Sequence, residues 1–198
     1  MDEFENDHEE GNKEDGFPIP KIFLNSDTHA PMTNCVQCDY DLLSGGRFYV
    51  VEKIFKKYPS FQKTEILFEY AVCSDCYEKM KGQLSKESME NLAAYMAANT
   101  DYQGMQERIA AHPESPEKWL SHCMIKGTPK EEMTEFQMGA CFKGDRLMTN
   151  TMPPFIIGGF AIEEMNALLS KQTKDEMDDF MGENFGIPPE LRKDLILI

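Results

Sequence analysis

The sequence predicts an α+β fold in which a β-hairpin is followed by helices and the same arrangement then occurs a second time. Residues 47–55 and 65–72 are rich in β-branched and aromatic residues, which is typical of paired strands. Residues 84–99 and 169–184 are helix-like and align with each other without gaps at an offset of 85 positions. A chain of 198 residues is long enough for one sizeable core or two small ones.

The first 32 residues differ in composition from the rest. Residues 1–16 hold eight acidic residues against the single base Lys13, and so supply −7 of the formal net charge of −15. This stretch has few apolar residues, and we expect an acidic disordered tail. Residues 17–32 contain three prolines and little periodicity, which indicates a linker or extended segment.

No basic stretch followed by an apolar one opens the sequence, and no run of eighteen apolar residues occurs. We therefore expect a cytoplasmic protein that does not enter a membrane. Thiols stay reduced in that compartment, so the six cysteines point to metal binding or catalysis before disulfides.

Four of the cysteines form two CxxC pairs, Cys35 with Cys38 and Cys73 with Cys76, which bracket the predicted hairpin. Two residues between ligands let a tight turn present both sulfurs to one ion, and zinc accepts four thiolates in tetrahedral geometry. The spacing predicts one structural zinc ion. Iron fits the same four-sulfur cage and stays open as an alternative.

The order of CxxC turn, hairpin and second CxxC at the start of a helix resembles the treble-clef zinc finger over residues 33–84. The resemblance implies that Cys35 and Cys38 lie in the knuckle, with Cys73 at the end of the last strand and Cys76 in the first helical turn. It extends no further along the chain.

A thioredoxin-type redox couple is the rival interpretation, because a strand, a CxxC pair and a helix also occur in that order there. It leaves Cys35 and Cys38 without a role, and no βαβ unit precedes Cys73. A disulfide-stapled secreted fold is weaker still, since nothing directs export.

The offset of 85 also extends upstream of the helices, where it pairs Cys38 with Cys123. A second hairpin is expected from residues 135–141 and 146–150, joined at 143–145. Chance similarity between two amphipathic helices is the alternative. The domains predicted are a zinc-binding module (33–100), a helical connector (101–119) and a degenerate repeat (120–198). In this register the other three ligands correspond to residues that cannot bind metal, namely Leu120 for Cys35, Gly158 for Cys73 and Ala161 for Cys76.

Cys123 and Cys141 lie near His112 and His122 in sequence, and two thiols with two imidazoles could form a second metal site. Their spacing matches no usual template. Buried reduced cysteine is the alternative, and the sequence leaves the choice open.

The sequence contains no G-x-S-x-G, Walker, H-E-x-x-H or dinucleotide-binding motif. Four cysteines would also fill the coordination position that a catalytic zinc keeps open. A non-catalytic module that binds another protein is therefore expected, with zinc enzymes and thiol redox proteins as weaker classes.

Nucleic-acid binding is the main alternative function. Residues 53–64 contain no acid and interleave bases with aromatic residues, which could contact phosphates and stack on bases. The net charge of −15 opposes approach to a polyanion. The candidate contacts are Lys53, Lys56, Lys57 and Lys63.

Overall fold

The computed structural model describes residues 16–186. The predicted acidic tail thus lies, apart from Gly16, outside the described residues, as does the last part of the predicted repeat, 187–198. The strands are β1 (Phe17–Pro18), β2 (Phe48–Tyr58), β3 (Lys63–Cys73), β4 (Glu135–Lys143), β5 (Arg146–Leu147) and β6 (Phe155–Gly158). The α-helices are α1 (Ser74–Gln83), α2 (Lys86–Asn99), α3 (Tyr102–Ala111), α4 (Pro116–Trp119), α5 (Gly159–Ala167) and α6 (Lys171–Phe185). Three short 3₁₀ turns are η1 (Lys21–Phe23), η2 (Pro59–Phe61) and η3 (Lys130–Glu132).

The strands form one antiparallel sheet in the order β1-β5-β4-β2-β3, and β6 also pairs with β4. At the centre of the β2–β4 ladder, Lys53 lies opposite Met138, which is 85 positions later in the sequence. An antiparallel pair has a local two-fold axis, so near this point residues i and i+85 lie on opposite sides of one axis. Helices α1 and α5 begin 85 positions apart, as do α2 and α6.

The first hairpin is longer than its sequence pattern indicates, because β2 and β3 run almost to the 3₁₀ turn at residues 59–61. Its ladder shifts register once. Ile54 faces Phe68, the next residue Phe55 faces Ile66, and Leu67 is left over as a β-bulge. Bulges on edge strands bend the strand and redirect a side chain. Leu67 is accordingly 50% exposed.

The second hairpin differs from the expectation. Its return arm is only β5, two residues long, although strand structure was expected through residue 150. The chain then leaves the edge of β4 and rejoins it as β6. Pro153 and Pro154 precede β6, and proline cannot donate a ladder hydrogen bond, which helps to explain the interruption.

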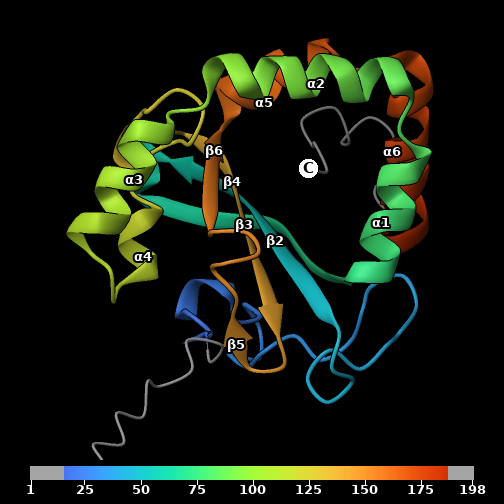
Figure 1. The fold of residues 1–198 in the computed structure, drawn as a ribbon, viewed down its shortest axis with the longest axis horizontal. Coiled ribbons are helices and arrows are strands. Elements are labelled where there is room, and N and C mark those ends of the chain that lie inside the picture. Colours follow the sequence, from blue (N-terminus) through green and yellow to red (C-terminus); the bar gives the residue numbers. More distant parts are fainter. Residues whose placement is uncertain (1–15, 187–198) are drawn as a thin grey trace, which may run out of the picture.

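The two faces of the sheet are covered by different segments. On one face, Tyr70 of β3 contacts the rings of Phe180 and Phe185 in α6. On the other, Phe23 of η1 packs on Phe142 of β4. Figure 1 shows α1 and α2 as an angled pair, with α6 close to α1 and α5 close to α2. Within residues 16–186 no helix combines the length and apolar character needed to cross a bilayer.

Candidate metal centre

The four cysteines of the two CxxC pairs converge on one point. Cys35 and Cys38 lie in a turn before β2, Cys73 is the last residue of β3, and Cys76 lies in the first turn of α1. Their Sγ atoms all lie within 4.8 Å of one another. These residues are 35 or more positions apart across the two pairs, so the hairpin β2–β3 brings them together.

The spacing of the sulfurs fits one tetrahedral ion. Four ligands at a Zn–S distance of about 2.3 Å place their sulfur atoms about 3.8 Å apart. The Sγ atoms of Cys38 and Cys73 are 3.7 Å apart. A disulfide needs an S–S distance near 2.05 Å, and all six cysteines are free thiols. The donor set and its geometry therefore suit a metal that prefers thiolate ligands.

Backbone hydrogen bonds fix the turn that carries the first pair. The Cys35 N–H donates to the Tyr40 carbonyl and the Asp39 N–H to the Cys35 carbonyl, each at 2.9 Å. Asp39 has a φ of 57°, the left-handed conformation that closes such turns and that aspartate tolerates. The Val36 N–H donates to Ala71 on β3, which anchors the turn beside the second pair.

Local dipoles favour the thiolate form of Cys35. The Cys73 N–H points at the Cys35 Sγ at 3.4 Å. Burial opposes ionisation of Cys35, but the N–H groups of Cys73, Cys38 and Gln37 outweigh it and lower the pKa of this thiol. Burial, followed by contacts with the neighbouring thiols, raises the pKa of Cys76. Binding of a metal to all four sulfurs would therefore release protons.

The Arg47 side chain also links the turn to α1, on the exposed side of the cysteine cluster. The Arg47 guanidinium lies 4.1 Å above the Tyr40 ring and 3.0 Å from the Asp75 carboxylate. Tyr40 follows the first CxxC pair, and Asp75 lies inside the second. The exposed ion pair contributes little by itself, on the order of 0–1 kcal/mol. A metal would be the stronger link between the two segments.

The backbone of this turn occurs again around Cys123. The Cys123 N–H donates to the Thr128 carbonyl and the Gly127 N–H to the Cys123 carbonyl, in the same spacing as around Cys35. Gly127 has a φ of 63°, as Asp39 does at 57°. The Gly158 N–H donates to the Cys123 Sγ at 3.3 Å. Cys123 therefore occupies the position of Cys35.

This corrects the register expected from the sequence, which matched Cys123 with Cys38 and Leu120 with Cys35. The offset is 88 in the turn and 85 in the helices, so three fewer residues separate Cys123 from the start of α5 than separate Cys35 from the start of α1. In the corrected register Lys126 stands in the place of Cys38. Its ammonium lies 2.6 Å from the Glu164 carboxylate and 5.7 Å from the centre of the Tyr95 ring. A paired ammonium thus stands at the position that corresponds to the Cys38 thiol.

The other cysteine and histidine residues do not assemble a second centre. Within residues 16–186, the four cysteines described above form the only cluster of three or more potential ligands. Cys141 lies on β4 opposite Val50, and burial raises the pKa of its thiol to about 11. His122 Nδ1 contacts the Ser121 hydroxyl at 2.9 Å. Cys123 and Cys141 are both buried, and no cluster of potential ligands forms around them among the described residues.

Of the four lysines considered for nucleic-acid contact, Lys53 does not reach the surface. It is 1% exposed, and its ammonium lies 2.6 Å from the Glu69 carboxylate and against the Leu24 carbonyl. The ladder places Glu69 directly opposite Lys53. The pair lies between the sheet and the N-terminal segment, where it contacts Leu24 and Ser26. The prediction of a nucleic-acid contact at this residue is wrong, because Lys53 belongs to the core.

The remaining three lysines of the tip have partners as well. Lys56 pairs with Glu135, and Lys63 pairs with Glu65. The Lys57 ammonium donates to the Lys130 carbonyl. Residues 53–64 contain no acidic residue, but neighbouring residues of β3 and β4 place carboxylates beside these lysines in the fold.

Sequence reasoning missed a buried polar pair at the centre of the sheet. Glu52 is 1% exposed, and its carboxylate accepts hydrogen bonds from the Tyr70 hydroxyl and from Gln137 Nε2 at 3.1 Å. Burial raises the pKa of Glu52 to about 8, although both hydrogen bonds oppose this shift. Glu52 and Gln137 are 85 positions apart, so the repeat offset carried a signal for this contact.

Comparison with known proteins identifies no relative: no family model, curated protein or solved structure matches the chain.

Proposed function

We propose that Cys35, Cys38, Cys73 and Cys76 bind one structural zinc ion in a non-catalytic protein that works by binding another protein. The observation that carries the metal assignment is the convergence of all four sulfurs within 4.8 Å. Zinc suits this donor set because it accepts four thiolates in tetrahedral geometry and brings no redox chemistry of its own.

The proposed role of the ion is to hold the turn at residues 33–42 against the end of β3 and the start of α1. That turn has little regular structure of its own, and its hydrogen bonds are mainly internal. A metal that joins Cys35 and Cys38 to Cys73 and Cys76 contributes directly to folding free energy, as structural zinc does elsewhere. The order of turn, hairpin and helix supports the resemblance to a treble-clef finger.

We further propose that residues from the turn at Cys123 onward are a second copy of this unit that has lost its metal. Support comes from the shared turn hydrogen bonds, the common helix starts and the two-fold contacts. Buried apolar residues such as Phe136, Ile156 and Met165 stabilise the second copy in place of an ion.

Four cysteine ligands leave no open position for substrate or water, which argues against a zinc enzyme. A Cys73–Cys76 redox couple would not require Cys35 and Cys38 beside it. Reduced thiols at this site and at Cys123 agree with a cytoplasmic location.

The surface that best fits a protein partner is the outer part of the hairpin β2–β3, residues 56–67, which we name the hairpin tip. Phe61 is 79% exposed and Leu67 is 50% exposed through its bulge, so two large apolar side chains stand in solvent on one hairpin. Exposed apolar groups surrounded by polar ones often mark interaction sites. Nucleic acid is the second candidate, and the pairing of Lys56 and Lys63 with carboxylates weakens it.

A comparison of variants separates the two candidates. We expect the full-length protein to retain a partner from extracts of its source cell, and we expect a Phe61→Ser and Leu67→Ser variant to lose that partner. Phe160→Ser is the matched control, because Phe160 is 67% exposed but lies on α5. Equal losses in both variants would contradict a specific role of the tip.

The nucleic-acid arm measures binding to RNA and DNA across a salt series, with Lys56, Lys57 and Lys63 changed to Ala. Lys53 must stay, because its removal would damage the core. Binding that weakens steeply with salt, with a slope that flattens in the variant, would support the alternative function instead.

A further inference from the structure

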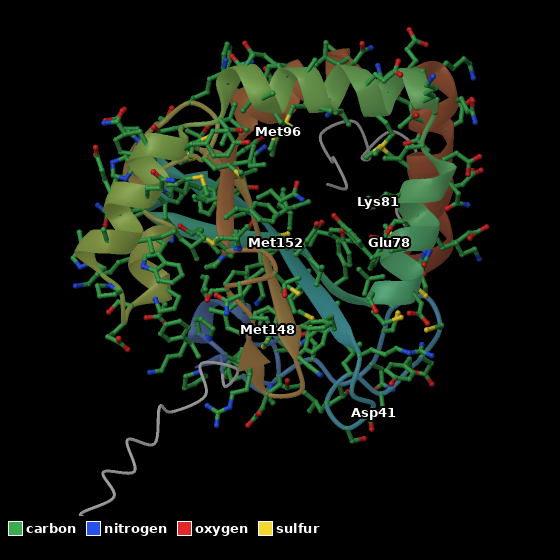
Figure 2. The ribbon with its side chains drawn as sticks, in the orientation of Figure 1. Asp41, Glu78, Lys81, Met96, Met148 and Met152 are labelled. Carbon is green, nitrogen blue, oxygen red and sulfur yellow. The ribbon has the colours of Figure 1, made fainter. Side chains whose placement is uncertain are left out.

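A cavity of about 240 Å³ lies between α1, α2 and α6 above the sheet. Its walls are almost entirely apolar, and Tyr70 of β3 contributes from the sheet side. In Figure 2, Met96 lies on the side of α2 that faces the sheet, and Lys81 lies on α1 at the edge of the same space. The apolar walls include Met80, Met89, Leu92, Met96, Met177 and Phe180.

The size and the lining of this cavity call for an apolar occupant. An apolar cavity of about 150 Å³ stays dry and binds a molecule as large as benzene. The present one is larger and partly open to solvent, so an inserted apolar group would remove the side chains around it from water. Methionine side chains adapt their shape to an inserted group, which suits such a site.

The described part of the chain ends next to this cavity. Phe185, the last residue of α6, packs its ring 4.1 Å from Phe68 and 5.8 Å from Tyr70, measured between centroids. Tyr70 itself lines the cavity. The twelve residues 187–198 follow, and twelve residues can span at most about 40 Å. This segment can therefore reach any wall of the cavity.

The sequence of that segment matches the cavity in chemistry. Residues 195–198 read Leu-Ile-Leu-Ile, four aliphatic residues without a polar group. They follow Arg192, Lys193 and Asp194, which carry both signs of charge. Charges of both signs also stand at the edge of the cavity, on Lys81 and Glu176.

We propose that the cavity binds residues 195–198 of the same chain as its apolar occupant. The insertion completes the core between α1, α2 and α6, and it links the end of the second copy to the helices of the first. The cavity is then an internal site and not the surface for a protein partner, which leaves that role to the hairpin tip. This proposal does not depend on the identity of the metal.

Methionine methyl groups provide the test, because several of them line the cavity. The full-length protein is labelled with ¹³C at methionine methyls and with labelled Leu and Ile methyls. We expect through-space NOEs from Met89, Met96 and Met177 to the methyls of residues 195–198. In a Leu195→Ser and Leu197→Ser variant, these methionine signals should shift, while those of Met105 and Met148, outside the cavity lining, should stay in place.

Two further variants keep the result interpretable. Ala93→Phe fills the cavity from α2, and it should abolish the same NOEs while the segment keeps its sequence. Phe61→Ser, an apolar-to-polar change at an exposed position, should leave them unchanged.

Absence of the NOEs, with methionine signals that ignore the Leu195 and Leu197 changes, would overturn the proposal. It would also be overturned if mass spectrometry of the denatured protein found a retained apolar molecule. NOEs that disappear on dilution and return with concentration would identify a second copy as the donor of the segment, and would likewise contradict it.

Discussion

Ser85 and Ser170, which are 85 positions apart, share a hydrogen bond of 2.8 Å between their side-chain hydroxyls. Each is the N-cap of its helix: the Ser85 hydroxyl accepts from the Ser88 N–H in α2, and the Ser170 hydroxyl from the Thr173 N–H in α6. Their own N–H groups donate crosswise, Ser85 to Thr173 Oγ1 and Ser170 to Ser88 Oγ. The two caps thus form one reciprocal cluster.

The first prediction follows from this cluster. Loss of an N-cap hydroxyl costs about 1 kcal/mol of unfolding free energy, and each of Ser85→Ala and Ser170→Ala should show at least that loss. Because the two hydroxyls also bond to each other, the loss of unfolding free energy in the double variant should differ from the sum of the losses in the two single variants. Chemical denaturation of the four proteins in the cycle measures the coupling.

The control cycle combines Ser85→Ala with Asp101→Ala, since Asp101 caps the separate helix α3. That pair should be additive to within about 0.5 kcal/mol. Additivity of the Ser85 and Ser170 changes to the same degree would contradict a shared cluster.

The second prediction tests the proposed loss of a metal site. Lys126→Cys, Gly158→Cys and Ala161→Cys add three thiols around Cys123, in the places of Cys38, Cys73 and Cys76. A Cβ at Gly158 would approach only the flexible Met133 side chain closely, with Sδ at 2.9 Å. The triple variant should bind about two zinc ions per chain.

Elemental analysis of the folded variant reads this out, and a further Cys123→Ser change should return the content to that of the natural sequence. If the folded triple variant binds no additional zinc, the four positions around Cys123 do not have the geometry of a metal site, and the proposed loss of a site is contradicted.

The third prediction concerns the buried ion pair of Lys53 and Glu69. Lys53→Met leaves the Glu69 carboxylate, which also accepts from the Ser26 N–H at 2.8 Å, without its cation. Breaking such a pair typically costs about 3–5 kcal/mol. Urea denaturation should show a loss of this order. Lys63→Met, at an exposed pair, should change stability by less than about 1 kcal/mol.

The fourth prediction is a pH dependence at Glu52. Its folded pKa of about 8 lies above the ordinary value of 4.5, so the folded state binds a proton that the unfolded state releases. Stability should therefore fall as pH rises from about 4.5 to 8, by at most about 1.4 kcal/mol per unit. Above the folded pKa the penalty is complete.

Glu52→Gln removes this titration and offers an amide donor to Gln137 Oε1, which has no hydrogen-bond partner among the described residues. The difference in unfolding free energy between the variant and the natural protein, measured from pH 5 to 8, should grow with pH in favour of the variant. Tyr70 and Tyr77 are the titratable groups facing Glu52, and both have raised pKa values, so they do not titrate in this window. A difference that stays constant would contradict a buried carboxyl at this position.

Sequence reasoning located the cluster of four cysteines because CxxC spacing is local and because the strand pattern predicted a hairpin between the two pairs. It also found the repeated helices through their offset. The register of the second turn was wrong by three residues, since an insertion in a loop leaves no periodic trace. The turn hydrogen bonds around Cys123 and the Gly158 N–H bond to its sulfur show the correspondence with Cys35.

The status of Lys53 shows a different limit. Its charge suggested a solvent-facing tip, although alternation already placed it on one face with Val51 and Phe55, both buried. The deciding fact is that Glu69 lies opposite it on β3, which depends on hairpin register. The bulge at Leu67 alters that register beyond Ile54, and no sequence pattern indicated it.

The most direct test of the central claim is the metal content of the full-length protein purified without added metal. We expect about one zinc ion per chain, with loss of the ion in a Cys73→Ser and Cys76→Ser variant and full retention in a Cys123→Ser and Cys141→Ser variant. A folded protein with no bound metal, or with zinc that survives loss of Cys73 and Cys76, would contradict the account. One iron per chain would keep the site and refute its assignment to zinc.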